Sequence, residues 1–241
     1  KHFGHFLLEV ITSLWPEPGT VQPHGLLFHR SFRGGLPKNT DAPAPPALSS
    51  WQRDMLSFAG YGDLPVLTVQ RRRTRVEELT VPSRPLSLRQ WAQPEATAVW
   101  HRMAAAVPPT EGPQRVFLSR SAFNASATGW HVRSSPDWDE RVEREVVRHG
   151  FTVVTPEVLS IAEQIALVRS ASVLAGASGS ALHLSAFAEP GTRVLEIGDR
   201  RSHGAAQPSQ QMVDAARGHL TAFVDHGDLA GLTAVLTSLE G

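Results

Sequence analysis

The stretch Val173-Leu-Ala-Gly-Ala-Ser-Gly-Ser-Ala-Leu-His183 decides the fold that this sequence predicts. Its first residues are small or apolar, as in a buried strand, and Gly176-Ala-Ser-Gly-Ser180 then predicts a tight turn that opens a helix over 178–188. A strand that ends in this way presents backbone N–H groups and the positive end of a helix to an anion. The stretch is therefore either a cradle for a diphosphate or a strand–helix joint that binds nothing.

Strands and helices alternate on both sides of this stretch. Strands are expected at 115–120, 151–154, 173–175, 193–197 and 219–224. Helices are expected at 139–149, 160–170, 212–217 and 228–239. Such alternation predicts a parallel sheet of right-handed βαβ units, which binds ligands at the carboxyl ends of its strands. Arg120, Glu157 and Gly176 all lie at expected strand ends and should share that edge.

The first half of the chain is also mixed α/β. Helices are expected at 1–14, 51–59 and 94–106, and strands at 26–28, 64–69 and 74–81. His5 and Glu9 are four residues apart and share one face of the first helix, either as an ordinary surface pair or as a general base, Glu9, held beside His5. Because Lys1 stands inside that helix, we expect the N-terminal domain to lack its natural start.

The proline-rich segment 107–113 predicts a domain boundary. It would separate an N-terminal α/β domain at 1–107 from a C-terminal domain at 113–241. The closing helix of the second domain is expected to pack back across the first.

Composition excludes several classes of protein. The 241 residues are 41% hydrophobic, with 23 basic and 23 acidic residues, so a folded core is expected and bulk nucleic-acid binding is not. Cysteine is absent, and no apolar run reaches the roughly 18 residues that span a membrane. Asp137-Trp138-Asp139 matches a metal-binding D-x-D pattern, but its place before a charged helix favours Asp137 or Asp139 as an N-cap. The run Arg71-Arg72-Arg73 is a solvated edge or a contact to an acidic group.

Several motifs occur in the order and spacing of one enzyme family. They are Phe3-Gly4-His5-Phe6-Leu7-Leu8-Glu9, Phe117-Leu118-Ser119-Arg120, Glu140-x-x-Glu143, Gly150-Phe151, Pro156-Glu157-x-Leu159-Ser160, Glu163-Gln164, Gly176-x-x-Gly179-x-Ala181-Leu182-His183 and Val194-Leu195-Glu196-Ile197. In these motifs the chain resembles the family 61 glycosyltransferases. It departs from them at Ser178, where the family often has histidine, and at Asp139, where it often has asparagine.

The resemblance implies a GT-B-like α/β fold, in which two Rossmann-like domains enclose a cleft. It also implies an inverting, metal-independent transfer of a sugar from a nucleotide-sugar donor, expected to be UDP-linked, to a glycan acceptor. Bacterial capsule or surface polysaccharide synthesis in the cytoplasm, at or near the inner membrane, is the expected setting, without cofactor, metal or nucleic acid. The alternatives are a non-catalytic nucleotide- or sugar-binding module and, as a third reading, a nucleotide-sugar epimerase. The oligomeric state is left open.

The resemblance also assigns roles to residues. Glu9 is expected to be the catalytic base, with His5 orienting it or acting as the base itself. Arg120 should bind the leaving diphosphate. The expected donor-binding residues are Arg120, Gln164, Gly176, Ser178, Gly179, Ser180, Ala181, Leu182, His183 and Glu196.

Overall fold

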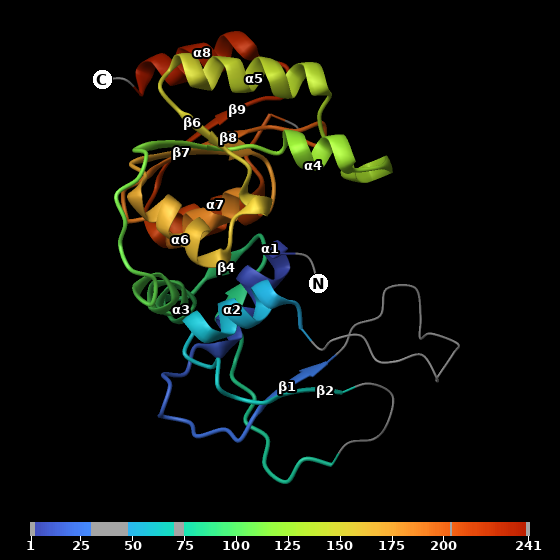
Figure 1. Ribbon diagram of the computed structural model, residues 1–241, viewed down its shortest axis with the longest axis vertical. Coiled ribbons are helices and arrows are strands. Elements are labelled where there is room, and N and C mark those ends of the chain that lie inside the picture. Colours follow the sequence, from blue (N-terminus) through green and yellow to red (C-terminus); the bar gives the residue numbers. More distant parts are fainter. Residues whose placement is uncertain (1–2, 30–47, 70–74, 203, 240–241) are drawn as a thin grey trace.

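The C-terminal half of the chain is built on a five-stranded parallel sheet in the order β6-β5-β7-β8-β9 (Figure 1). The computed structural model describes residues 3–29, 48–69, 75–202 and 204–239. The strands are β5 (Arg115–Leu118), β6 (Thr152–Val154), β7 (Val173–Ala177), β8 (Arg193–Ile197) and β9 (Leu220–Val224). All five expected strands are therefore present, and the expected α/β class with a parallel sheet is confirmed.

The strand order reverses between β5 and β7. The chain moves outward from β5 to the edge strand β6 and then returns to the other side of β5 to form β7. In doubly wound sheets this reversal leaves a crevice outside the carboxyl ends of the two central strands, where ligands bind. Leu118 and Gly176 pair across this point, so the segments that follow them begin side by side.

Helices cover both faces of the sheet. Figure 1 shows α5 (Pro136–Arg148) and α8 (Leu229–Ser238) on one face, and α6 (Ile161–Ser170) and α7 (Pro208–Arg217) on the other. The Thr233 hydroxyl of α8 donates to the Glu145 carboxylate of α5 at 2.6 Å, and Leu232 and Leu236 enter the core on that face. The expectation that the closing helix packs across the N-terminal half is therefore wrong, because its apolar side completes the outer face of the sheet.

Two expected helices differ from the structure in capping or in kind, and a third, expected from 212, starts at Pro208. Helix α5 starts at Pro136 with Ser135 as its N-cap, so neither Asp137 nor Asp139 caps it. The second error is the α-helix expected over 178–188. Strand β7 instead continues to Ala177, a turn follows, and a six-residue 3-10 helix, η5 (Leu182–Phe187), comes after it.

The turn after β7 has a physical cause. The Ser178 amide donates to the Ile197 carbonyl at 2.8 Å, which extends the contact with β8, and Gly179 has a φ of +151°, outside the helical range. A short 3-10 helix supplies little of the dipole expected at the start of a long α-helix.

The N-terminal half contains shorter elements. A continuous helical run is formed by α1 (Phe3–His5), a π-helical turn η1 (Phe6–Val10) and a 3-10 turn η2 (Ile11–Leu14). Strand β1 (Leu26–His29) pairs in parallel with β2 (Val66–Val69), and β3 (Leu86–Ser87) pairs antiparallel with β4 (Trp91–Ala92). The remaining helices are α2 (Ser50–Phe58) and α3 (Pro94–Ala105). The strand expected at 74–81 is wrong for residues 75–81, where Val81 is 75% exposed. Arg71-Arg72-Arg73 lies outside the described residues.

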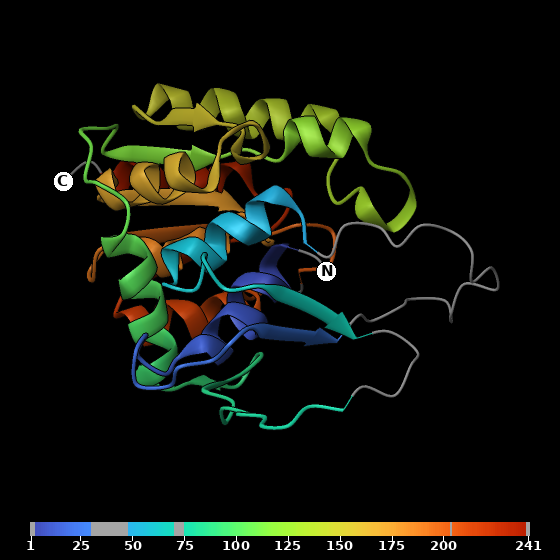
Figure 2. The same ribbon diagram turned by 60° about the horizontal axis from the view of Figure 1, so that its bottom comes forward.

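One hydrophobic core joins the two halves. Figures 1 and 2 show the N-terminal helical run and α3 on the side of the sheet that carries α6 and α7. Trp100 of α3 is fully buried there, and its indole N–H donates to the Leu7 carbonyl at 3.3 Å. Arg169 of α6 donates to the carbonyls of Ala104 and Val107 at 2.8 and 2.6 Å. The N-terminal helix is therefore held against the C-terminal half of the chain. Within the described residues, no helix is long and apolar enough to cross a membrane.

Candidate functional site

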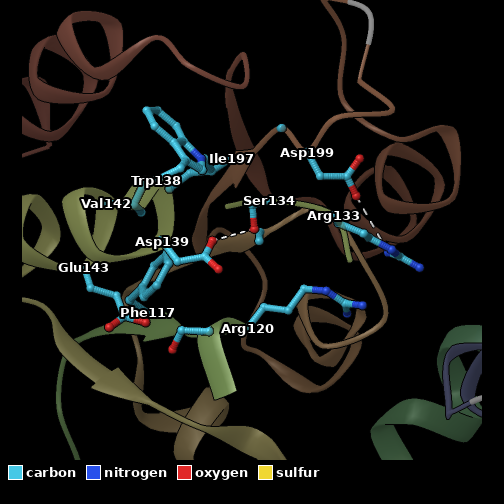
Figure 3. A pocket seen from close by; sticks show the side chains of 13 residues that line it. Phe117, Arg120, Arg133, Ser134, Trp138, Asp139, Val142, Glu143, Ile197 and Asp199 are labelled. Carbon is cyan, nitrogen blue, oxygen red and sulfur yellow. Dashed lines mark hydrogen bonds and ion pairs between the residues drawn. The ribbon is translucent and has the colours of Figure 1, made fainter. Parts of the chain in front are cut away.

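A small hollow opens at the carboxyl edge of the sheet, beside the point where the strand order reverses (Figure 3). One part of its lining is apolar and comes from the sheet and from α5: Phe117, Trp138, Val142 and Ile197. The other part is charged or polar and includes Arg120, Arg133, Asp139 and Asp199. Such a combination of an apolar wall with a few convergent polar groups is typical of a ligand site.

Two arginines stand together on the polar side. Arg120 follows β5 directly, and its guanidinium carbon lies 4.3 Å from the centre of the Phe123 ring, which holds the side chain in place. Arg133 lies in the connection between β5 and α5 and donates from Nη1 to the Ser178 carbonyl at 3.3 Å. Figure 3 shows both guanidinium groups on the same side of the hollow, away from Trp138.

Gly179 allows the loop after β7 to approach these arginines. A Cβ at this position would lie 3.0 Å from Nη1 of Arg133 and 3.6 Å from Nη1 of Arg120. Gly179 also has a φ of +151°, which side chains disfavour. A glycine is thus required for the backbone to meet two guanidinium groups at this edge.

Basic and acidic side chains act on one another in this cluster. Asp199 is 2% exposed and lies 2.6 Å from Nη2 of Arg201 and 3.8 Å from Nη1 of Arg133. Burial lowers the pKa of Arg133 to about 10, and repulsion from Arg120 and Arg201 adds to the effect. Burial likewise lowers the pKa of Arg120. Arg120, Arg133 and Arg201 thus gather beside Asp199, and Glu157 and Asp139 also attract Arg120.

The two arginines also keep unused hydrogen-bond donors. The Nε atoms of Arg120 and Arg133 are buried without a partner within the described residues. An unpaired buried donor costs free energy that a ligand oxygen would recover. The sequence predicted Arg120 from its place after a strand, but Arg133 was missed, because it lies in a connection whose short helices α4 (Ser121–Ser126) and η3 (Gly129–His131) have no clear sequence pattern.

Three of the expected donor-binding residues point into the protein. The Ser178 hydroxyl is fully buried and donates to the Glu196 carboxylate at 2.5 Å. Glu196 also accepts from the Gln207 amide at 3.0 Å, and burial raises its pKa to about 7. The Gln164 carboxamide donates to the carbonyls of Pro156 and Leu159, both at 3.0 Å. These contacts fix the shape of the surrounding loops, and a direct role in donor binding stays a prediction for all three.

Three further residues of the expected set hold the backbone. Gly176 lies inside β7, where a Cβ would meet the Leu118 carbonyl at 3.2 Å. Leu182 is fully buried, and Ala181 precedes η5. They position the loop that carries Gly179 and Ser180.

The N-terminal helical run brings His5 and Glu9 to this loop. A Cβ on Gly4 would lie 2.8 Å from the Ser180 hydroxyl and 3.1 Å from Cδ2 of His183, so the two segments touch. His5 Nδ1 and Glu9 Oε2 are 2.6 Å apart, and their side chains are 51% and 38% exposed. Glu9 lies in the π-helical turn η1, a rare geometry that is frequent at functional sites. The structure thus brings the segment of His5 and Glu9 against the segment of Ser180 and His183, although the two segments are far apart in the sequence.

The D-x-D pattern is part of the structure of the loop. The Asp139 carboxylate accepts from the Ser134 hydroxyl at 2.5 Å and from the Asn124 amide at 2.9 Å. Within the described residues no three side chains of the metal-ligating types are grouped as a metal site would need.

Fold and site together define an α/β protein with a cationic site at the switch point of a doubly wound sheet. Comparison with known families identifies it further: the model of the family described as Glycosyltransferase 61 matches residues 3–195. The chain belongs to glycosyltransferase family 61, as its motifs suggested. Membership implies a glycosyltransferase with donor and acceptor substrates. A search among curated proteins gives no match.

Proposed function

We propose that the chain is an inverting, metal-independent glycosyltransferase that moves a sugar from a UDP-linked donor to a glycan acceptor in the synthesis of a bacterial capsule or surface polysaccharide. The observation that carries the proposal is the pair Arg120 and Arg133, which meet the Gly179 loop through Nη1 at the switch point of the sheet and keep unused Nε donors. Cations that stabilise a leaving diphosphate take the place of a metal ion in such a reaction.

The order of the residues along the edge suggests how the donor lies. The nucleoside would lie over the mouth of the hollow and the diphosphate would meet Arg120 and Arg133. The sugar would then extend past Ser180 toward the N-terminal helix, which touches the loop at Gly4. In this arrangement residues 113–241 hold the donor and residues 1–107 face the acceptor, as in a GT-B enzyme, and the enzyme works in the cytoplasm.

The chemistry follows from this arrangement. Glu9, oriented by His5 at 2.6 Å, takes the proton of the acceptor hydroxyl as its oxygen attacks the anomeric carbon. The bond from that carbon to the diphosphate oxygen breaks, and the electron pair stays on the diphosphate. Arg120 and Arg133 stabilise the charge that develops there. Attack from the face opposite the leaving group inverts the anomeric centre.

Calorimetry with UDP tests the donor site. Arg120→Met and Arg133→Met should each weaken UDP binding by about 10- to 100-fold, because each removes a charge-assisted contact of roughly 1.5–3 kcal/mol. Arg144→Met is the matched control: this arginine of α5 is 61% exposed and pairs only loosely with Glu140, at 3.9 Å. Wild-type protein that binds no nucleotide would contradict the proposal.

Transfer assays with a panel of nucleotide sugars test the base. Glu9→Gln should lower kcat by two orders of magnitude or more and leave UDP affinity unchanged, because general-base catalysis contributes about 10²–10⁴-fold. If the wild type binds UDP but neither transfers nor hydrolyses any donor, the chain is a binding module and not an enzyme.

A further inference from the structure

A buried hydrogen-bond network lies behind the Ser180 loop, between η5 and α7. His183 Nδ1 and Gln210 Oε1 are 2.8 Å apart. The Gln210 amide nitrogen donates to the Ser185 hydroxyl at 2.9 Å and to the Asp214 carboxylate at 2.8 Å, and Ser185 donates to the same carboxylate at 3.0 Å. Their exposed fractions are 9% for His183, 1% for Gln210, 0% for Ser185 and 3% for Asp214. The mechanism above gives this network no role.

The network fixes the tautomer of His183. The Gln210 amide nitrogen donates toward the Ser185 and Asp214 oxygens, and the Asp214 carboxylate would repel the amide oxygen if the group turned over. The Gln210 oxygen therefore faces His183 and can only accept, so Nδ1 of His183 carries the proton. Burial lowers the pKa of His183 to about 4, so the ring is neutral at neutral pH and Nε2 is unprotonated.

The free nitrogen is on the side of the ring that faces the N-terminal helix. Cδ2, the ring atom bonded to Nε2, lies 3.1 Å from the position of a Cβ on Gly4. The charge of the neighbouring His5 also acts on His183 and adds to the lowering of its pKa. Within the described part of the chain, Nε2 has no hydrogen-bond partner. The edge of the ring that bears this acceptor therefore faces the helical run that carries His5.

We propose that Nε2 of His183 accepts a hydrogen bond from a hydroxyl group of the transferred sugar, and that Gln210 and Asp214 are positioning residues that keep this nitrogen unprotonated. The inference rests on the proposed function, because it needs a donor sugar in the cleft. It adds a specificity determinant: a donor whose sugar lacks that hydroxyl leaves the nitrogen unpaired and is disfavoured.

Two substitutions of His183 distinguish the contact made by Nδ1 from the contact proposed for Nε2. In His183→Asn the amide can replace Nδ1 toward Gln210 but nothing replaces Nε2, whereas in His183→Gln the amide reaches the position of Nε2 and loses the Gln210 contact. We expect His183→Asn to lower kcat/KM for the nucleotide sugar by about tenfold or more while UDP affinity stays unchanged, because UDP lacks the transferred sugar. His183→Gln should recover part of that loss. Unchanged kcat/KM in His183→Asn would overturn the proposal.

Singly deoxygenated donors identify the hydroxyl. Removal of one particular hydroxyl should lower kcat/KM about tenfold for the wild type. The same removal should change kcat/KM little for His183→Asn, because that variant already lacks the contact. If every position costs both proteins equally, no hydroxyl contacts His183 and the proposal fails. This outcome differs from failure of the proposed function, in which the wild type binds no UDP at all.

Nitrogen NMR of histidine-labelled protein at pH 7.5 tests the tautomer without relying on the variants. The wild type should show His183 with a proton on Nδ1 and none on Nε2, and Gln210→Leu should shift the population toward the other tautomer. A wild-type spectrum with the proton on Nε2 would overturn the inference even if His183→Asn does not fold.

Discussion

Gly4 is the residue at which the N-terminal helix comes closest to the Ser180 loop. A methyl group there would lie 2.8 Å from the Ser180 hydroxyl and 3.1 Å from the His183 ring, so one of the two segments must move. We expect Gly4→Ala to destabilise the protein by about 1–3 kcal/mol, as overpacking does, and to lower kcat because Glu9 moves away from the donor. Denaturant unfolding and steady-state kinetics measure the two effects.

The same contact supplies a control. Ser180→Gly removes the two nearest atoms on the loop side and should restore part of the stability when it is combined with Gly4→Ala. If Gly4→Ala alone changes neither stability nor kcat, the helix and the loop do not touch in solution.

Glu196 makes the stability of the protein depend on pH. Burial raises its pKa from 4.5 to about 7, so between these values the folded protein keeps a proton that the unfolded chain has lost. The free energy of unfolding therefore falls as pH rises through this window, by up to roughly 3 kcal/mol from this group. His183 acts in the opposite direction, because its lowered pKa of about 4 removes stability as pH falls below 6.5.

A difference measurement isolates the Glu196 contribution. Glu196→Gln cannot ionise, so its free energy of unfolding relative to wild type should rise between pH 4.5 and pH 7 and stay level above that. His183 and Asp214 contribute to both proteins and cancel in the difference. Parallel pH profiles for the two proteins would show that folding does not raise the pKa of Glu196.

Sequence patterns found individual site residues unevenly. Arg120, His5 and Glu9 were expected from the family resemblance, because a strand end or a shared helical face alone left an ordinary structural role open. Arg133 was not predicted, because its position depends on where a long connection folds back. The Arg200 amide donates to the Arg133 carbonyl at 3.0 Å and so holds that connection. The inward orientation of Ser178 was also unpredictable, since it follows from a buried partner 18 residues away.

At the scale of elements, the capping box of α6 is a signal that the sequence predicted and the structure confirms. Ser160 accepts from the Glu163 amide at 3.3 Å, and the Glu163 carboxylate accepts from the Ser160 amide at 2.7 Å. Ser160→Ala should lower the free energy of unfolding by about 1 kcal/mol with kcat unchanged, and Ser160→Asp, which keeps a cap, should lower it much less. Equal losses in the two variants would mean that the cap does not stabilise the helix.

Element prediction failed where tertiary contacts outweigh local pattern. Residues 178–188 are small and apolar and favour a helix, yet the bond from the Ser178 amide to Ile197 prolongs the strand contact instead. The π-helical turn at Phe6–Val10 was also unpredictable. A π-helical turn differs from an α-helical one by one residue, and over a single turn the apolar spacing is too short a pattern to distinguish the two. Both failures lie at the proposed site, where local rules are most often broken.

At the scale of the molecule, alternating strands and helices were sufficient to predict the parallel sheet, but not how the two halves meet. That contact depends on buried side chains from distant segments, and it includes Trp100 and Met103 of α3 with Phe187 of η5 and Met212 of α7. Because these residues form one core, loss of either half exposes the apolar surface of the other. The protein should therefore unfold in one cooperative transition.

Trp100→Ala tests this cooperativity. The side chain is fully buried and bonds to the Leu7 carbonyl, so its removal should lower the free energy of unfolding by about 3–5 kcal/mol. Far-UV circular dichroism, which reports mainly the C-terminal sheet and its helices, should shift together with the calorimetric transition, because the cavity weakens a core that both halves share. If the variant instead melts in two steps, with the C-terminal half keeping the wild-type Tm, the halves are independent. The donor loop would then keep its shape without the N-terminal helix, and UDP should bind to the half-unfolded protein.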